Sequence, residues 1–374
     1  MKIGFISFHS FSNPGGVKNH ILGLSKEFEK RNIETKIIVP RRKLKEKYGN
    51  NVILLGTSIP LNMGGTQGDL VCNFNPLAIK RMLNREKFDI LHFHNFIIPS
   101  ASQILERSDT TNIITFHANT ESIPLLDTMI NNLSGLINHK VKGVIGVASF
   151  NLEPFKKYNG PKEVIPNGID LTEFNPGIKR LDKFDNSKIN ILFLGRIEER
   201  KGLIYLLKAY KLLQEKHNNL RLIIVGEGPL KEECEKYSEE NDLQEVYWEG
   251  AQNGEIVPKY FATCDIYCSP AIFGESFGIV ILEAMAMGKP VCGFSNIGYK
   301  ELLQNTKGEE FLADPRNEIQ LTEKLDKLIS DEKLREEMGN WGLEEVQKYS
   351  WEKVADRVLE FYKKCNKFDD KNKE

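Results

Sequence analysis

The strongest chemical signal in this sequence of 374 residues is a pair of glutamates, Glu275 and Glu283, eight positions apart. Gly274 and Gly278 stand beside Glu275 in a loop that opens a helix expected over Phe277–Met287, and such a helix start presents free amides to a phosphate. Glu283 falls in the apolar part of that helix, where a carboxylate needs hydrogen-bond donors, and a ribose diol supplies two. The motif predicts a nucleotide site. The alternative is a helix-capping Glu275 and a salt-bridged Glu283.

A charged loop that follows an expected strand, Ile189–Leu194, is the second candidate. Arg196 is expected at the carboxyl end of that strand and Lys201 at the start of the next helix. A guanidinium binds two phosphate oxygens in a fork and an ammonium acts as a point charge, so this pair suits a diphosphate. The alternative is a solvated loop in which Glu198 and Glu199 pair with these cations.

The N-terminal half of the sequence carries two weaker candidates. Gly15 and Gly16 separate the first expected strand from a helix expected over Val17–Lys30. Two glycines allow a ligand to approach the backbone, and the alternative is a plain turn. His117 follows the expected strand Asn112–Phe116, and the carboxyl ends of strands are where open α/β sheets bind ligands. A lone histidine is otherwise a structural residue.

Two runs of alternating strands and helices must position these residues. Apolar strand-like segments alternate with helix-period segments in each half of the chain, with a polar stretch between them. This pattern predicts an α/β protein with two Rossmann-like, doubly wound domains, whose parallel sheets face each other across a cleft. We place a first domain at 1–170, a second domain at 171–350, a C-terminal helix at about 351–365 and a polar tail at 366–374.

The composition excludes several functional classes. The 51 Lys and Arg residues balance 52 Asp and Glu residues, so bulk positive charge for nucleic acid is absent. No apolar run approaches the ~18 residues of a membrane span, and the N-terminus does not resemble a signal peptide. Six cysteines lack CxxC spacing and are expected to be reduced. We therefore expect a cytoplasmic protein without a nucleic-acid partner.

The helix expected over Pro76–Lys87 combines basic residues with apolar ones. The interpretation we favour is a solvated helix with a buried apolar stripe, because Glu86 dilutes the basic patch. The alternative is peripheral contact through residues 76–87 with the anionic inner face of the plasma membrane.

These motifs together resemble the retaining glycosyltransferases of family 4, which have the GT-B fold. The resemblance rests on PGG at Gly15–Gly16, on the strand ends FHN and TFH, and on PNGID at Pro166–Asp170. It rests also on GR(x4)KG at Arg196 and E(x7)E at Glu275, and it extends from Met1 to about Tyr362. Within the family, the chain is most similar to the phosphatidylinositol mannosyltransferases.

The resemblance implies transfer of a hexose, of the mannose or glucose type, from a nucleotide diphosphate sugar such as GDP-mannose to an acceptor hydroxyl with retained configuration. It implies no metal and no other cofactor, and the sequence has no DxD motif. The implied catalytic residues are His117, Arg196, Lys201 and Glu275. Donor binding is assigned to Gly15, Gly16, Arg196, Lys201, Glu275, Phe277, Gly278, Ile279, Val280 and Glu283, and the acceptor side to His9, Lys18 and His20.

The sequence departs from the phosphatidylinositol-specific pattern on the acceptor side. His9 replaces a tyrosine, Lys18 replaces a glutamine, Glu121-Ser122 replaces a threonine and a lysine, and the loop Asn62–Asn73 lacks arginines. The acceptor therefore stays open between a lipid, a glycan and a small molecule, and the donor base and sugar stay open as well. Alternatives for the whole protein are a nucleotide-sugar epimerase of the same fold and a binding module without turnover.

Overall fold

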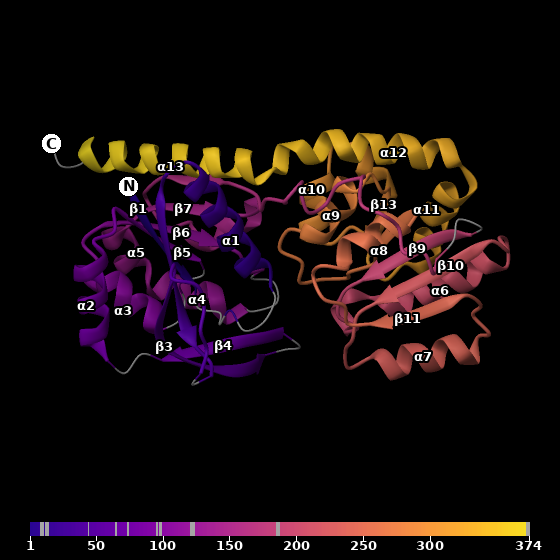
Figure 1. The fold of residues 1–374 in the computed structure, drawn as a ribbon, viewed down its shortest axis with the longest axis horizontal. Coiled ribbons are helices and arrows are strands. Elements are labelled where there is room, and N and C mark those ends of the chain that lie inside the picture. Colours follow the sequence, from indigo (N-terminus) through magenta and orange to yellow (C-terminus); the bar gives the residue numbers. More distant parts are fainter. Residues whose placement is uncertain are drawn as a thin grey trace. The chain divides into compact units, whose positions relative to one another are not determined.

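The computed structural model of the protein describes two compact units, 1–168 with 351–374 and 169–350 (Figure 1). The backbone is described except at 8–10, 12–14, 44, 64–65, 73–74, 95, 97–98, 120–123, 185–187 and 372–374. Side chains are, in addition, left undescribed at 60–63, 66–72, 99–100, 124–127 and 369–371. The division after Gly168 lies two residues before the boundary that the sequence predicted.

The first unit is built on a sheet with the strand order β4-β3-β2-β1-β5-β6-β7-β8. The order reverses direction between β1 and β5, which makes their carboxyl ends the topological switch point of a doubly wound sheet. The central strands are buried on both faces, as in parallel sheets whose two faces are covered by helices. The strands are β1 (Lys2–Ser7), β2 (Glu34–Arg41), β3 (Val52–Met63), β4 (Thr66–Cys72), β5 (Ile90–His94), β6 (Thr111–Phe116), β7 (Val141–Gly146) and β8 (Lys162–Val164).

One part of this sheet contradicts the prediction of an all-parallel sheet. β3 extends to Met63, and β4 pairs with it antiparallel, with Thr57 opposite Cys72. The expected loop Asn62–Asn73 is therefore largely strand. Pro60 and the glycines of this segment lowered the strand signal; within the described residues, β3 beyond Thr57 pairs with β4 and no longer with β2, and a proline is tolerated where one side of a strand is unpaired.

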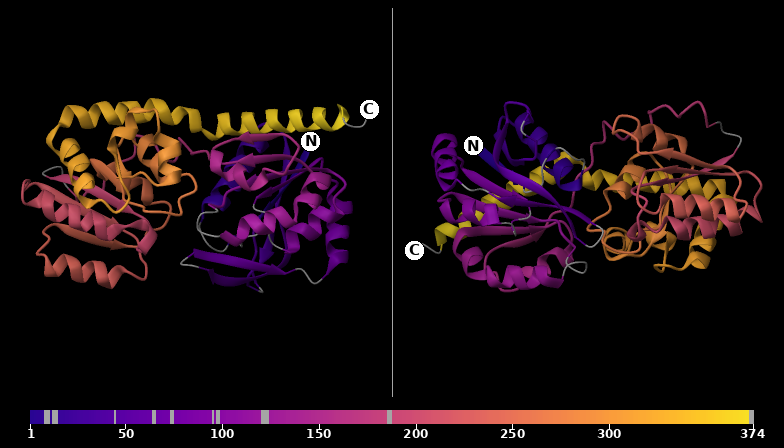
Figure 2. Two further views of the ribbon diagram at one scale, coloured as in Figure 1. Left: turned by 180° about the vertical axis from the view of Figure 1, so that it is seen from behind. Right: turned by 90° about the horizontal axis from the view of Figure 1, so that it is seen from below.

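Helices of the first unit include a long C-terminal one that returns to it. α13 (Trp351–Lys371) packs against α1 and β7, and Val354, Val358 and Phe361 join the same core as α1. In both views of Figure 2 this last helix, drawn in yellow, lies along the unit drawn in indigo and magenta. The helix continues to Lys371, so the expected tail 366–374 is mostly helical. The other helices are α1 (Gly16–Lys30), α2 (Pro76–Glu86), α3 (Pro99–Arg107), α4 (Pro124–Asn132) and α5 (Ser134–Lys140).

The second unit has a sheet of parallel strands in the order β11-β10-β9-β12-β13-β14, with its switch point between β9 and β12. The strands are β9 (Ile189–Leu194), β10 (Leu220–Val225), β11 (Val246–Gly250), β12 (Ile266–Ser269), β13 (Val291–Phe294) and β14 (Leu312–Ala313). The helices are α6 (Leu203–Gln214), α7 (Lys231–Glu240), α8 (Val257–Thr263), α9 (Ile279–Ala286), α10 (Ile297–Leu303), α11 (Glu318–Ser330) and α12 (Glu332–Glu345). Both units are Rossmann-like, which confirms the predicted fold class.

Candidate active site

The candidate residues of the second unit gather at its switch point. The loop after β9 carries Arg196 and Lys201, and the loop after β12 carries Glu275. These two strands are neighbours in the sheet although they are far apart in the sequence. The doubly wound topology therefore brings the two strongest sequence motifs to one place, the crevice at which open α/β sheets bind ligands.

Backbone contacts fasten these two loops to each other. The amide of Ile272 donates to the carbonyl of Arg200 over 2.7 Å, which ties the loop after β12 to the loop after β9. Gly202 has a φ of +66°, and a Cβ there would lie 2.1 Å from the carbonyl oxygen of Pro270. A side chain at this position would be strained and would push the loops apart. The site is therefore held by rigid, closely packed backbone.

Glu275 is the centre of a buried charge network. Its Oε1 accepts hydrogen bonds from Nη1 of Arg200 at 2.9 Å and from Nζ of Lys201 at 2.7 Å. Burial disfavours the ionised carboxylate, but the charges and hydrogen bonds of Lys201 and Arg200 outweigh it and place the pKa of Glu275 below its usual value. Glu275 is therefore an anion that two cations hold in one orientation.

The two predicted phosphate-binding cations differ in exposure. The side chain of Arg196 is 48% exposed and its Nε lies 3.1 Å from Glu198, whereas Lys201 is 13% exposed and pairs with Glu275. The pairing of Arg196 with Glu198 is the one that the alternative interpretation of this loop anticipated. Glu198 is buried and also pairs with Arg200, so it keeps a cation when the half-exposed Arg196 exchanges it for a ligand anion.

The start of α9 has the features of an anion-binding helix terminus. Gly278 precedes it with a φ of +98°, where a Cβ would lie 2.7 Å from the ring of Tyr299. This left-handed residue delays the helix to Ile279, two residues later than predicted, so the amides of Ile279 and Val280 form its first turn while Phe277 lies outside it. No side chain caps this terminus and no acidic residue occupies its first turn.

Glu283 lies one turn into α9 and is half-buried. Its pKa is raised to about 7, first by burial and then by the negative charge of Glu173, with Lys201 opposing the shift. Among the described residues its carboxylate has no hydrogen bond or ion pair. Glu283 is therefore a poorly compensated carboxylate near the helix start, which is the state expected of a group that awaits donors from a ligand.

The first unit places its predicted residues around the N-terminus of α1. Gly15 and Gly16 are exposed, and among the described residues beyond its chain neighbours no atom lies within 4 Å of a Cβ built on Gly15. Lys18 is half-buried, and its Nζ donates to the carbonyl of Phe11 over 2.9 Å. His9 lies outside the described residues. The open space at Gly15 leaves room for a ligand beside the helix start.

The sequence suggested that His117 is a lone histidine. In the structure it belongs to a buried cluster of histidines. Its Nε2 lies 3.0 Å from Nδ1 of His94, the last residue of β5, and its ring centroid lies 4.8 Å from that of His20 on α1. His20 Nδ1 lies 2.7 Å from Oδ1 of Asn167. The pKa of His20 is lowered to about 4, because the effect of burial is larger than the opposing effect of its hydrogen bond with Asn167. Burial also lowers the pKa of His94 well below its usual value.

The basic helix α2 has the buried stripe that our favoured interpretation required. Ile79 and Met82 are in the core, whereas Leu77 is 62% exposed and Lys80 and Arg81 face solvent. No helix among the described residues is long and apolar enough to cross a bilayer.

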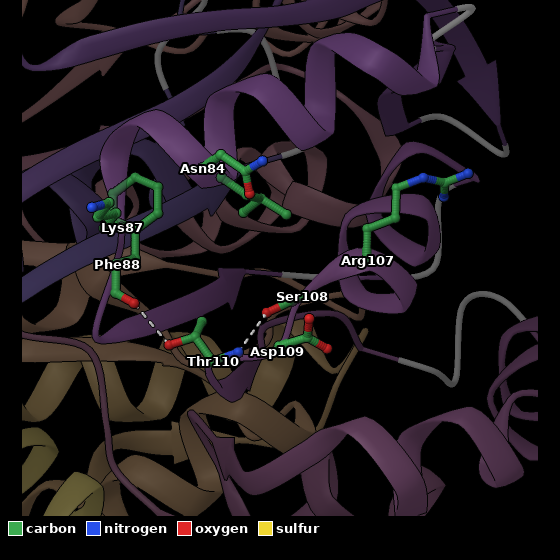
Figure 3. Close-up of a pocket in the computed structure, with 8 residues that line it drawn as sticks. Asn84, Lys87, Phe88, Arg107, Ser108, Asp109 and Thr110 are labelled. Atoms are coloured by element: carbon green, nitrogen blue, oxygen red, sulfur yellow. Dashed lines mark hydrogen bonds between the residues drawn. The ribbon is translucent and has the colours of Figure 1, made fainter.

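A separate small pocket of about 180 Å³ lies beside α2, at the amino ends of β5 and β6 (Figure 3). Thr110 in its wall donates to the carbonyl of Phe88 over 2.8 Å. The pocket is smaller than usual ligand pockets and lies at the edge of the sheet opposite the histidine cluster, so we do not assign it to the site.

Two contributors to these sites escaped the sequence analysis. Arg200 stands inside the quoted loop, but spacing alone did not show that it shares Glu275 with Lys201. His94 was visible as part of the strand end FHN, yet its contact with His117 depends on the adjacency of β5 and β6. In both cases the missing information was which strands are neighbours.

Comparisons with known proteins agree with this architecture. A family model described as Glycosyltransferase Family 4 matches residues 14–173, and one described as Glycosyl transferases group 1 matches residues 178–345. A phosphatidyl-myo-inositol mannosyltransferase of Mycobacterium leprae is 30% identical over 97% of this chain and 96% of its own length. The protein of the same description from Mycolicibacterium smegmatis is 28% identical over 97% and 93%.

Solved structures show the same fold at lower identity. Sucrose-phosphate synthase from Thermosynechococcus elongatus superposes with a TM-score of 0.77 at 18% identity, covering 97% of this chain and 98% of that one. Anabaena HepE in complex with UDP and glucose gives a TM-score of 0.72 at 20% identity over 97% and 99%.

Proposed function

Because this chain belongs to glycosyltransferase family 4 and has the GT-B fold, we propose that it transfers mannose from GDP-mannose to a hydroxyl of a membrane lipid, with retained anomeric configuration. Two findings support this proposal. Relatives named phosphatidyl-myo-inositol mannosyltransferase align over nearly the full length of the chain. The switch point of the second unit also carries the charges that a nucleotide diphosphate requires, and this is the observation on which the proposal depends.

The departing diphosphate is stabilised by groups that are already in place. Arg196 exchanges Glu198 for phosphate oxygens, and the amides of Ile279 and Val280 contribute the positive end of a helix dipole. Lys201 supplies a second positive charge. Fixed charges placed where negative charge develops need little reorganisation, and removing one such group typically costs 10²–10³-fold in rate.

The two glutamates serve different parts of the donor. Glu283 accepts hydrogen bonds from the ribose diol, which supplies the donors that its carboxylate lacks. Glu275 accepts hydroxyls of the transferred sugar. When Lys201 turns toward the diphosphate, Arg200 remains as the counter-ion of Glu275 and keeps its carboxylate oriented.

On the acceptor side, the family resemblance assigns His117 to the transferred sugar and the exposed glycines before α1 to the diphosphate. A departing phosphate oxygen can take the proton of the attacking hydroxyl, so the transfer needs no separate base. For a lipid acceptor the proposal takes up the alternative stated for α2: while its apolar stripe stays buried, its exposed Lys80 and Arg81 supply attraction to an anionic bilayer.

The experiment is a transfer assay with GDP-mannose and lipid vesicles that contain or lack phosphatidylinositol, followed by nuclear magnetic resonance of the product. We expect an α-mannosyl lipid and only slow hydrolysis in the absence of acceptor. A β-linked product would refute retention. Conversion of the donor to another sugar nucleotide without acceptor would refute transfer and support the epimerase alternative. Turnover of UDP- or ADP-sugars but not of GDP-mannose would refute the proposed donor.

A further inference from the structure

Three histidines of the first unit converge from separate elements in a way that the proposed transfer does not require. His20 belongs to α1, His94 ends β5, and His117 follows β6. One ring nitrogen of each lies within 4.8 Å of one ring nitrogen of both others, and all three residues are buried. Within the described part of the chain, these histidines are the group of His, Cys, Asp or Glu side chains that lies close enough together to hold a metal ion.

The hydrogen bonds of the cluster leave lone pairs without partners. Oδ1 of Asn167 can only accept, so Nδ1 of His20 carries the proton of a neutral ring and Nε2 presents a lone pair. Within the described part of the chain, Nε2 of His20 and Nε2 of His94 are buried and have no hydrogen-bond partner. Buried polar atoms are normally satisfied, and each exception calls for a missing partner.

We infer that His20, His94 and His117 form a binding site for a divalent transition metal ion, with Zn²⁺ as the best fit. Neutral imidazoles are the usual nitrogen ligands of Zn²⁺, at about 2.0–2.1 Å, which in tetrahedral geometry separates the nitrogens by about 3.4 Å. Nδ1 of His94 and Nε2 of His117 lie 3.0 Å apart in a hydrogen bond that a shared ion would replace, and one ring nitrogen of His20 lies within 4.8 Å of a ring nitrogen of each.

The surroundings of the cluster agree with a metal site. The hydrogen bond between His94 and His117 carries its proton on one of the two nitrogens, and a change of tautomer moves that proton to the other nitrogen of the same ring when a cation binds. Asn167 orients His20 through its other nitrogen, as outer hydrogen-bond partners of ligating histidines do. A bound ion would connect α1 to β5 and to the segment after β6, leaving a fourth position for water or another ligand.

Cobalt titration of the chelator-treated full-length chain tests this inference without any use of the sugar donor. We expect one Co²⁺ per chain with the visible spectrum of a low-symmetry site, displacement by Zn²⁺, and a higher unfolding temperature in Zn²⁺. His20→Asn and His94→Asn should weaken binding at least tenfold, and Asn167→Ala by about 10–100-fold. His92→Gln is the matched buried control, because both nitrogens of His92 have partners in Thr115 and Tyr362.

A second measurement needs no variant and so does not depend on their folding. In ¹⁵N-histidine-labelled wild-type protein, Zn²⁺ should shift the ring signals of three of the seven histidines. A folded wild-type chain that binds no metal, or binding that survives both ligand substitutions, would overturn the site. These readouts require neither the sugar donor nor transfer. A failure to bind metal would therefore leave the proposed function standing, and a failure to transfer mannose would leave the metal site standing.

Discussion

Replacing Glu283 with glutamine should stabilise the protein at pH 8 and leave it unchanged at pH 4. In the folded chain the pKa of Glu283 is about 7, against an ordinary value of 4.5. The folded state therefore holds this proton more tightly than the unfolded state, and the contribution of Glu283 to stability falls as pH rises from about 4.5 to about 7. Below that window both states are protonated and the glutamate costs nothing.

The size of the effect follows from the difference in pKa. A difference of about 2.5 corresponds to about 3 kcal/mol above pH 7, as an upper bound. For a unit of this size, that gain shifts the unfolding midpoint by roughly 6–12 °C. Glutamine is neutral throughout and keeps the shape of the side chain, so the variant removes the charge without leaving a cavity.

The assay is thermal unfolding at pH 4 and at pH 8 of three proteins: wild type, Glu283→Gln and the exposed control Glu336→Gln. We expect the Glu283 variant alone to gain stability at pH 8, while its nucleotide affinity falls because an amide is a weaker acceptor for the ribose diol. Equal destabilisation of this variant at both pH values would refute the reasoning, since Glu283 would then make structural bonds that the described contacts do not show.

Three further outcomes follow from the same structure. Arg196→Ala should lower the transfer rate on the order of 10²-fold while the unfolding midpoint stays within a degree or two, because Arg196 is half-exposed and Glu198 keeps its pair with Arg200; a full transfer rate would contradict this. His117→Asn should reduce transfer without changing nucleotide affinity measured calorimetrically, and a parallel loss of affinity would contradict its acceptor-side role. Gly23→Ala should destabilise the chain by about 1–3 kcal/mol in denaturant unfolding, because its Cβ would lie 2.2 Å from an indole ring, whereas Gly135→Ala meets nothing within 4 Å and should be neutral or stabilising.

The residues of the second unit were predictable because the signals were local. Glu275 and Glu283 belong to one helix and the loop before it, and Arg196 and Lys201 belong to one loop. Glycine and charge spacing is readable over such short distances. What spacing could not show was the partner of each charge: Arg200 and Lys201 both reach Glu275 only because β9 and β12 are adjacent.

The errors in the fold have local causes as well. The β3–β4 hairpin was missed because Pro60 and the glycines near the turn weaken strand propensity, while pairing at a sheet edge overrides it. The start of α9 was placed too early because the apolar pattern continues through Phe277, and only the left-handed backbone of Gly278 marks the true boundary. The length of α13 reflects its packing on the first unit, which a polar tail does not reveal.

The central claim is that the switch point of the second unit binds the donor diphosphate. It is tested most directly by calorimetric titration of GDP-mannose into wild type, Lys201→Ala and the exposed control Lys236→Ala. The account predicts saturable binding to wild type and to the Lys236 variant, and at least tenfold weaker binding to the Lys201 variant, since a charge-assisted contact contributes about 1.5–3 kcal/mol. Equal affinity in all three proteins, or no binding to any of them, would contradict it.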